Sequence, residues 1–308
     1  MPGLKIARIK QGGFRHPLIY LQNHIGSAKG SLAQGIRKRS FVTYAGLGRN
    51  GEFGNQLFQI GLVLGYAAKY GVRPILPRWR CERSGIEYWR LYPGLDYRDS
   101  IRCWTRYEQR HFAYQDLPFR FNVTLKGEFQ SAKYFPVLRS ELLRLFRPPL
   151  AVSTEVNAFC LKHHLERYDA MHMRFYVRPE DVTPAFRPSL DDAYYVKALQ
   201  ALESTGNPLI IVTNDVKLAT EFVQRQAIKK PYIITSNINS IVDFYLINRA
   251  QNIIISNSTF SWWAAYLSTS ALSVLAPTYR KWFAHPFSSR PSIDCSDMIP
   301  DEFRQIDF

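Results

Sequence analysis

The chain has 308 residues, is 46% hydrophobic and carries a formal net charge of +15. This length suits two domains of ordinary size or one large one, and the apolar content supports a substantial core, which excludes a globally disordered chain. No apolar run approaches the roughly 20 residues of a membrane span, and no signal-peptide pattern opens the sequence. We therefore expect a soluble, cytoplasmic protein.

The four cysteines, Cys81, Cys103, Cys160 and Cys295, are far apart in the sequence and form no close pair. Their spacing favours reduced thiols in a reducing compartment over a disulfide framework or a zinc site. Two histidines follow Cys160 closely, but this group fits an ordinary amphipathic helix. We expect no metal site.

Positive charge is concentrated at the N-terminus. Residues 1–40 contain eight Lys and Arg residues and no acidic residue, so this basic arm holds eight of the fifteen excess charges. Its composition fits a solvated tail, a peripheral membrane contact or part of an organelle-targeting peptide. No recognised nucleic-acid-binding module accompanies the charge, so we expect no nucleic-acid partner. The remaining excess of positive charge, outside residues 1–40, suits a polyanionic small substrate such as a nucleotide sugar.

In chain order, the first elements resemble the opening of a Rossmann-like unit. A strand at 41–45 is followed by a Gly-rich loop at 46–56 and by a helix at 57–71 that Gly71 caps. The glycines do not fit the dinucleotide fingerprint, so no nicotinamide cofactor is indicated. The next predicted elements are a strand at 74–77, short helices and loops that cover a cleft at 78–120, a strand leading into a turn at 123–135, and a helix at 136–147.

Pro148-Pro149 marks the predicted boundary between two domains. The prediction assigns residues 1–40 to the arm, 41–149 to an N-terminal domain and 150–308 to a C-terminal domain. Strands and helices alternate beyond the boundary, which indicates a parallel sheet covered on both faces. The predicted strands are 167–174, 208–213, 231–235, 252–256 and 271–276. The predicted helices are 153–165, 190–204, 215–226, 240–249 and 260–268.

One stretch combines a buried strand, a polar turn and the start of a helix. The β-branched run Ile253-Ile254-Ile255 is followed by five residues with hydroxyl or amide side chains, namely Ser256, Asn257, Ser258, Thr259 and Ser261. The first amides of a helix lack intrahelical partners and carry partial positive charge, so this geometry binds anions. An N-cap in front of a buried aromatic helix is the other interpretation. Because open α/β sheets bind ligands at the carboxyl ends of their strands, the cluster favours a phosphate site.

Two further polar groups follow predicted strands of the same domain. His172-Met173-Arg174 ends the strand at 167–174, where an arginine can make a bidentate contact with a diphosphate. The alternative is a surface arginine next to a histidine whose hydrogen bonds are made within the fold. Asn214-Asp215 directly follows the next strand, at 208–213, and suits a ribose or base, although Asp215 is equally suited to capping the following helix.

These residues carry a resemblance to the α-1,2-fucosyltransferases of glycosyltransferase family 11. It spans roughly residues 41–283 and rests on four segments in the family's order. The segments are Phe53-Gly54-Asn55-Gln56-Leu57-Phe58-Gln59; Gly127-Glu128-Phe129-Gln130-Ser131-Ala132-Lys133-Tyr134-Phe135; His172-x-Arg174 with Ser189-Leu190-Asp191-x-x-Tyr194-Tyr195; and Asp243-Phe244-Tyr245-Leu246 through Ser256-Asn257-Ser258-Thr259-Phe260-Ser261-Trp262-Trp263-Ala264-Ala265-Tyr266-Leu267.

The resemblance implies an α/β fold with two Rossmann-like domains that face each other across a cleft, the GT-B arrangement. The donor, GDP-L-fucose, would bind the C-terminal domain, and the acceptor, usually a terminal β-galactoside, would lie against the N-terminal domain. Transfer in this family inverts the anomeric carbon and needs no metal. The sequence agrees with this expectation, since it contains no Asp-x-Asp pair to hold a divalent cation against a diphosphate.

Roles carried over from the resemblance fall on positions that match the family's segments. Arg174 would bind the diphosphate and stabilise the charge of the leaving group. His172 would help hold the nucleotide. The remaining donor-side residues would be Asn257, Ser258, Thr259 and Phe260, and Asn55 with Gly54 and Gln56 would lie near the reacting centre on the acceptor side.

The chain departs from the family pattern directly after Arg174. The pattern continues His-x-Arg-Arg-Gly-Asp, whereas here Phe175 replaces the second arginine and Val177 replaces the acid. Losing one charge-assisted contact weakens donor binding by about 2–3 kcal/mol, unless Arg178 folds back and replaces the contact. The missing acid also removes an obvious general base, for which Glu52 is the substitute candidate. A solvated loop glutamate is the alternative interpretation of Glu52, and a strongly oxocarbenium-like transition state would need no strong base.

The leading hypothesis is an inverting, metal-independent galactoside 2-α-L-fucosyltransferase. A nucleotide-sugar-binding or glycan-binding protein of the same fold without turnover is an alternative, as is a transferase with another GDP-sugar or acceptor.

Overall fold

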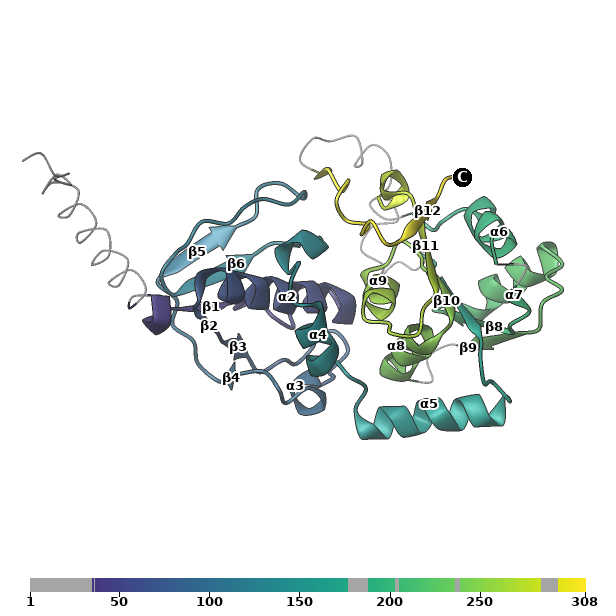
Figure 1. The fold of residues 1–308 in the computed structure, drawn as a ribbon, viewed down its shortest axis with the longest axis horizontal. Coiled ribbons are helices and arrows are strands. Elements are labelled where there is room, and N and C mark those ends of the chain that lie inside the picture. Colours follow the sequence, from purple (N-terminus) through teal and green to yellow (C-terminus); the bar gives the residue numbers. More distant parts are fainter. Residues whose placement is uncertain (1–34, 36, 177–187, 203–204, 236–238, 284–292) are drawn as a thin grey trace, which may run out of the picture.

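The computed structural model describes residue 35 and residues 37–176, 188–202, 205–235, 239–283 and 293–308. These residues form two α/β domains, each built on a parallel sheet, that face each other (Figure 1). The predicted fold class is therefore confirmed. Of the described helices, none is both long enough and apolar enough to cross a membrane.

The N-terminal domain contains a four-stranded sheet in the order β2-β1-β6-β5. Its strands are β1 (Phe41–Thr43), β2 (Arg73–Pro74), β5 (Thr105–Glu108) and β6 (Val123–Lys126), all parallel. A separate parallel pair joins β3 (Leu76–Pro77) to β4 (Tyr97–Arg98). The helical elements are α2 (Phe53–Tyr70), α3 (Tyr88–Leu91), the 3-10 turn η1 (Ala132–Tyr134) and α4 (Arg139–Leu145).

The C-terminal domain has a six-stranded sheet in the order β12-β11-β10-β7-β8-β9. Its strands are β7 (Asp169–Met173), β8 (Leu209–Thr213), β9 (Tyr232–Thr235), β10 (Asn252–Ile254), β11 (Ser273–Pro277) and β12 (Arg304–Ile306), all parallel. The helical elements are α5 (Leu150–Lys162), α6 (Asp192–Gln200), α7 (Val216–Arg225), α8 (Ser240–Arg249), α9 (Thr259–Tyr266) and the 3-10 turn η3 (Tyr279–Lys281). Read from β9, this order is that of a Rossmann domain.

Every strand and helix predicted for the second half is present, with shifts of a few residues at the ends. Each residue of β7, β8 and β10 is buried, as expected of central strands in a covered parallel sheet. The domain boundary stays a prediction; α5 begins directly after Pro149.

Two predictions about the first half are corrected. The segment at 74–77 forms two short strands in different sheets, because Pro74 and Pro77 lack the N–H group that a longer ladder needs. Strand β5 was not predicted within 78–120, since it is an edge strand whose Arg106 and Glu108 face solvent. The strand leading into a turn that was predicted at 123–135 is present, since β6 occupies 123–126 and Gly127 and Phe129 after it adopt positive φ. In the second half, the edge strand β12 was not predicted, because its residues Arg304–Ile306 show no strong apolar pattern.

The helix predicted at 57–71 begins earlier, at Phe53, so the Gly-Asn-Gln segment is its first turn and not a loop. The Phe53 ring is buried and stacks 5.6 Å from the Trp79 ring, so this first turn packs against the core. At the other end Gly71 adopts a φ of 65° and its N–H donates to the carbonyl of Ala67, which confirms the predicted cap.

A buried aromatic contact joins the two domains. The ring of Phe58 on α2 lies 4.5 Å from that of Trp262 and 5.1 Å from that of Trp263, both on α9. The Phe135 ring, after η1, stacks 5.3 Å from Trp263. Since such rings bury large apolar areas and pack in specific geometries, this contact holds the two domains in one orientation.

Candidate active site

The order of the C-terminal sheet reverses between β7 and β10, which places a crevice outside their carboxyl ends. Ligands of open α/β sheets bind at this kind of switch point. His172 is near the end of β7, and Ser256 follows β10. Their side chains share a hydrogen bond of 2.9 Å between His172 Nδ1 and Ser256 Oγ. The two polar strand ends identified in the sequence therefore meet.

The N-terminal sheet has a corresponding switch point between β1 and β6. The loop after β1 leads into α2, and the turn Gly127–Gln130 follows β6. The amide of Gln130 donates through Nε2 to Asn55 Oδ1 at 3.2 Å, so these two segments also meet. The switch points of both domains open into the same cleft, which has a volume of about 600 Å³.

Nine of the predicted site residues line this cleft. They are Glu52, Gly54, Asn55, His172, Arg174, Asn214, Ser258, Thr259 and Phe260. Their roles stay predictions, but the structure brings them together from both halves of the chain.

The N-termini of α2 and α9 touch at the floor of the cleft. A Cβ atom on Gly54 would lie only 2.4–2.6 Å from backbone atoms of Thr259 and Phe260, so only glycine permits this approach. Thr259 Oγ1 donates to Asn55 Oδ1 at 2.7 Å across the contact. Both helix ends carry partial positive charge, and an anion in the cleft would offset their mutual repulsion.

Arg174 lines the cleft directly after β7. Its guanidinium carbon lies 5.4 Å from the centre of the Tyr176 ring, a cation–π contact that orients the side chain. The Tyr176 hydroxyl donates to the carbonyl of Asn257 at 3.2 Å. This contact ties the segment after β7 to the turn before α9.

Asn214 positions the same segment. Its side chain accepts a hydrogen bond from the Phe175 N–H at 2.8 Å and donates to the Phe175 carbonyl at 2.9 Å. The Phe175 side chain packs against the buried cluster of the C-terminal domain, and this residue is not among those that line the cleft. Position 175 therefore supplies no second cation to the site, whereas Arg83 of the N-terminal domain does line the cleft. Val177 and Arg178 lie outside the described residues.

His172 is held in its neutral form. Burial, with a smaller contribution from the charge of Arg174, lowers the pKa of His172 to about 3. The imidazole ring lies 5.6 Å from the Phe260 ring. A neutral imidazole between Ser256 and Phe260 can hydrogen-bond a ligand in the cleft but has no charge with which to pair an anion.

This pKa predicts a pH-dependent stability. Because the pKa of His172 is lower in the folded chain than in the unfolded chain, protonation on acidification favours unfolding. The free energy of unfolding should fall as the pH drops below about 6.5, by up to roughly 1.4 kcal/mol per pH unit from this residue. Urea denaturation of wild type and His172→Gln between pH 7 and pH 5 measures the effect. Equal pH slopes for the two proteins would contradict it.

Three predicted site residues do not line the cleft. Gln56 is buried and donates to the Gly51 carbonyl at 2.8 Å while its Oε1 accepts from Trp79 Nε1. Asn257 is buried and donates to the carbonyls of Pro188 and Trp282. Asp215 accepts from the Leu218 N–H at 3.1 Å as the N-cap of α7, the alternative kept open from the sequence. Their observed contacts are structural, and none of the three is a cleft residue.

Several cleft residues were not singled out as site residues from the sequence. Asp243 is buried, and its Oδ1 accepts from Thr235 Oγ1 at 2.8 Å. Glu128, Arg83 and Tyr88 line the N-terminal side. Asp243 and Glu128 lie within the segments that carried the family resemblance, which was the available signal for both.

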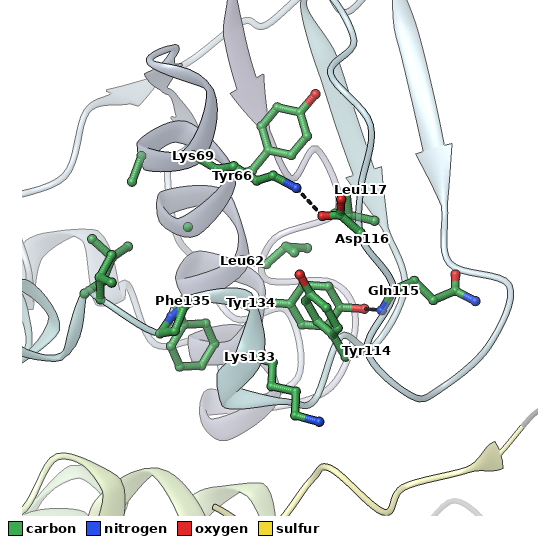
Figure 2. Close-up of a pocket in the computed structure, with 15 residues that line it drawn as sticks. Leu62, Tyr66, Lys69, Tyr114, Gln115, Asp116, Leu117, Lys133, Tyr134 and Phe135 are labelled. Carbon is green, nitrogen blue, oxygen red and sulfur yellow. Dashed lines mark hydrogen bonds and ion pairs between the residues drawn. The ribbon is translucent and has the colours of Figure 1, made fainter.

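A second cavity, of about 250 Å³, lies in the N-terminal domain between α2, η1 and the segment at 114–117 (Figure 2). Lys69 pairs with Asp116 on one side, and the Gln115 N–H donates to the Tyr134 hydroxyl at 3.1 Å. It includes none of the predicted site residues. Among the residues that the structure describes, no group of three or more His, Cys, Asp or Glu side chains is arranged to hold a metal ion.

Comparison with known proteins connects this site to a family. The model of the family "Glycosyl transferase family 11" matches residues 176–294, which include α6 to α9 and the turn before α9. The class of protein that this region defines is a glycosyltransferase. This is the family that the sequence resembled, and its model matches this region of the chain.

Two relatives and one solved structure are similar to parts of this chain. The chain is 36% identical over 106 residues to the O-antigen biosynthesis glycosyltransferase WbnK of Escherichia coli, a match that covers 33% of this chain and 34% of that protein. It is 23% identical over 214 residues to an alpha-1,2-colitosyltransferase of Escherichia coli, covering 67% and 70% of the two chains. The crystal structure of fucosyltransferase NodZ from Bradyrhizobium aligns with a TM-score of 0.48 and 11% identity, covering 74% of this chain and 93% of that one.

Proposed function

We propose that the protein is an inverting, metal-independent glycosyltransferase that moves L-fucose from GDP-β-L-fucose to the 2-OH of a terminal β-galactoside. One observation carries the proposal. Arg174, a neutral His172 and the N-termini of two helices converge on one cleft between the domains. This arrangement suits a diphosphate, because guanidinium groups and helix N-termini both bind phosphate oxygens.

The two sides of the cleft have different tasks in the proposed reaction. The diphosphate lies against Arg174 and the start of α9, which stabilise the charge that develops on GDP as it leaves. The acceptor lies against the N-terminal domain, near Asn55. Its hydroxyl attacks the anomeric carbon from the side opposite the leaving group, and such a direct displacement inverts the configuration.

A donor that carries colitose is the second candidate. The relative named an alpha-1,2-colitosyltransferase matches over two thirds of this chain, although its identity is low. Assays should therefore compare colitose and fucose donors. A peripheral membrane contact through residues 1–40 is a further proposal, and all but residues 35 and 37–40 of that arm lie outside the described residues.

The proposed function predicts transfer from GDP-fucose to a β-galactoside in the presence of EDTA, at the rate measured without chelator. Radiolabelled GDP-fucose and a panel of β-galactosides measure the transfer, and NMR of the product establishes the α configuration. A rate that collapses in EDTA and recovers with Mg²⁺ or Mn²⁺ would contradict metal independence. GDP binding by calorimetry without transfer or donor hydrolysis would favour the alternative of a binding protein.

A further inference from the structure

Glu128 lies at the carboxyl end of β6, at the switch point of the N-terminal sheet, and lines the cleft. Its Oε2 accepts a hydrogen bond from Gln130 Nε2 at 3.0 Å. The same amide nitrogen donates to Asn55 Oδ1, which in turn accepts from Thr259 Oγ1. Glu128 is thus the acceptor-side end of a hydrogen-bonded chain that crosses to the first residue of α9.

The turn that carries Glu128 has an unusual backbone. Gly127 has a φ of 149° and Phe129 a φ of 50°, so residues on both sides of Glu128 adopt positive φ. For a bulky residue such as Phe129 this conformation is strained, and strain of this kind persists only where the surroundings impose it.

Contacts around the turn impose this conformation. Gln109 Oε1 accepts from the N–H groups of Glu128 and Phe129 at 2.8 and 3.0 Å. The Tyr44 hydroxyl donates to the Gly127 carbonyl at 2.9 Å. A Cβ on Gly127 would lie 2.4 Å from the Cβ of Gln109, so the turn also requires glycine there. The segments that carry Gln109 and Tyr44 therefore hold the turn that places this carboxylate in the cleft.

The other carboxylates among the described cleft residues are less suited to receive a proton from an acceptor. Glu52, the candidate from the sequence, has its Oε1 3.2 Å from Arg83 Nε, so an acceptor hydroxyl would have to compete with the guanidinium for this carboxylate. Asp243 is buried on α8, in the donor-side domain, where it accepts the Thr235 hydroxyl. Glu128 receives its hydrogen bond from a neutral amide and belongs to the acceptor-side domain.

We propose that Glu128 is the general base of the transfer, an inference that rests on the proposed function. As the acceptor oxygen forms its bond to the anomeric carbon, the hydroxyl proton passes to the Glu128 carboxylate. The bond between the anomeric carbon and the β-phosphate oxygen breaks, and GDP leaves with that electron pair. Asn55 and Gln130 orient the carboxylate toward the acceptor.

The test compares two nucleophiles in the full-length protein. With GDP-fucose as donor, lactose or water must lose a proton to react, whereas azide is already an anion and needs no base. Glu128→Gln should lower transfer to lactose, or donor hydrolysis if lactose is not accepted, by about 10² to 10⁴-fold. The same variant should form fucosyl azide at a rate within a few fold of wild type and should bind GDP with unchanged affinity.

Two control variants make the result specific. Glu108→Gln alters an exposed carboxylate on the neighbouring strand β5, paired with Lys126, and should leave both reactions unchanged. Glu52→Gln tests the rival base, and we expect a loss of less than ten-fold.

The outcomes separate this inference from the proposed function. Full activity of Glu128→Gln with lactose or water would overturn the role of Glu128, and so would equal losses with azide. An azide-rescued loss in Glu52→Gln but not in Glu128→Gln would assign the base to Glu52. A folded wild-type protein that neither transfers nor hydrolyses GDP-fucose would overturn the proposed function, and this inference with it.

Discussion

Replacing Arg174 by Ala is expected to lower the turnover number for transfer by about 10² to 10³-fold. The guanidinium faces the cleft beside the Tyr176 ring, and the adjoining backbone is fixed by Asn214. Removing its charge takes away the cation nearest the start of the helix that would hold the departing diphosphate, and the helix N-termini replace it only in part. Because the interaction strengthens as charge develops, the turnover number should fall more than the affinity for GDP-fucose.

Steady-state kinetics with varied GDP-fucose measure this effect. Arg174→Lys keeps a positive charge but loses the fork of donors, so its activity should lie between those of wild type and the alanine variant. Arg225→Ala is the matched control, since Arg225 pairs with Asp192 on the surface of the same domain. An alanine variant at position 174 with wild-type turnover would refute the assigned role and remove the main support for the donor site.

Replacing Gly54 by Ala should impair both stability and activity. The added methyl group would lie 2.4–2.6 Å from the backbone at Thr259 and Phe260, which belong to a rigid helix start and cannot rotate away. Overpacking of this kind costs about 1–3 kcal/mol. The strain is relieved only if α2 and α9 separate, and a displacement of about 1 Å at a reacting centre can lower the rate by about 10²-fold.

Thermal unfolding and transfer assays on the same preparation test this prediction. Gly46→Ala serves as the control, because its methyl group would meet only side-chain atoms of Tyr44 and Asn50 at 3.3–3.4 Å. We expect a lower melting temperature and slower transfer for Gly54→Ala alone. If Gly54→Ala matches wild type in both measurements, the two helix ends are not in contact as described.

The outcomes of the sequence predictions differ between the two halves of the chain for a physical reason. In the second half, apolar strands of three to five residues alternate with helices, and this local pattern defines β7 to β11 and α5 to α9. In the first half the strands are short, some contain proline, and β5 exposes one face. Their pairing depends on neighbours far away in the chain, so the local pattern did not reveal them.

The polar residues of the site show a similar division. The sequence showed that Arg174, Asn257 and Ser258 lie at the ends of strands. It does not distinguish a polar side chain that hydrogen-bonds to buried backbone groups from one that faces a ligand. The structure places Arg174 and Ser258 at the cleft and gives Asn257 buried backbone partners. Glu128 went unnoticed because only its strained turn, held by Gln109, directs it into the cleft.

The sequence by itself determined the class of fold, the alternation of strands and helices in the second half and the resemblance to a family, because periodicity and short motifs are local properties. Only the tertiary structure decided which strand ends are neighbours, that the starts of α2 and α9 touch at Gly54, and which carboxylates line the cleft. These features depend on sheet order and on contacts between residues that are distant in sequence. A local pattern does not encode such contacts.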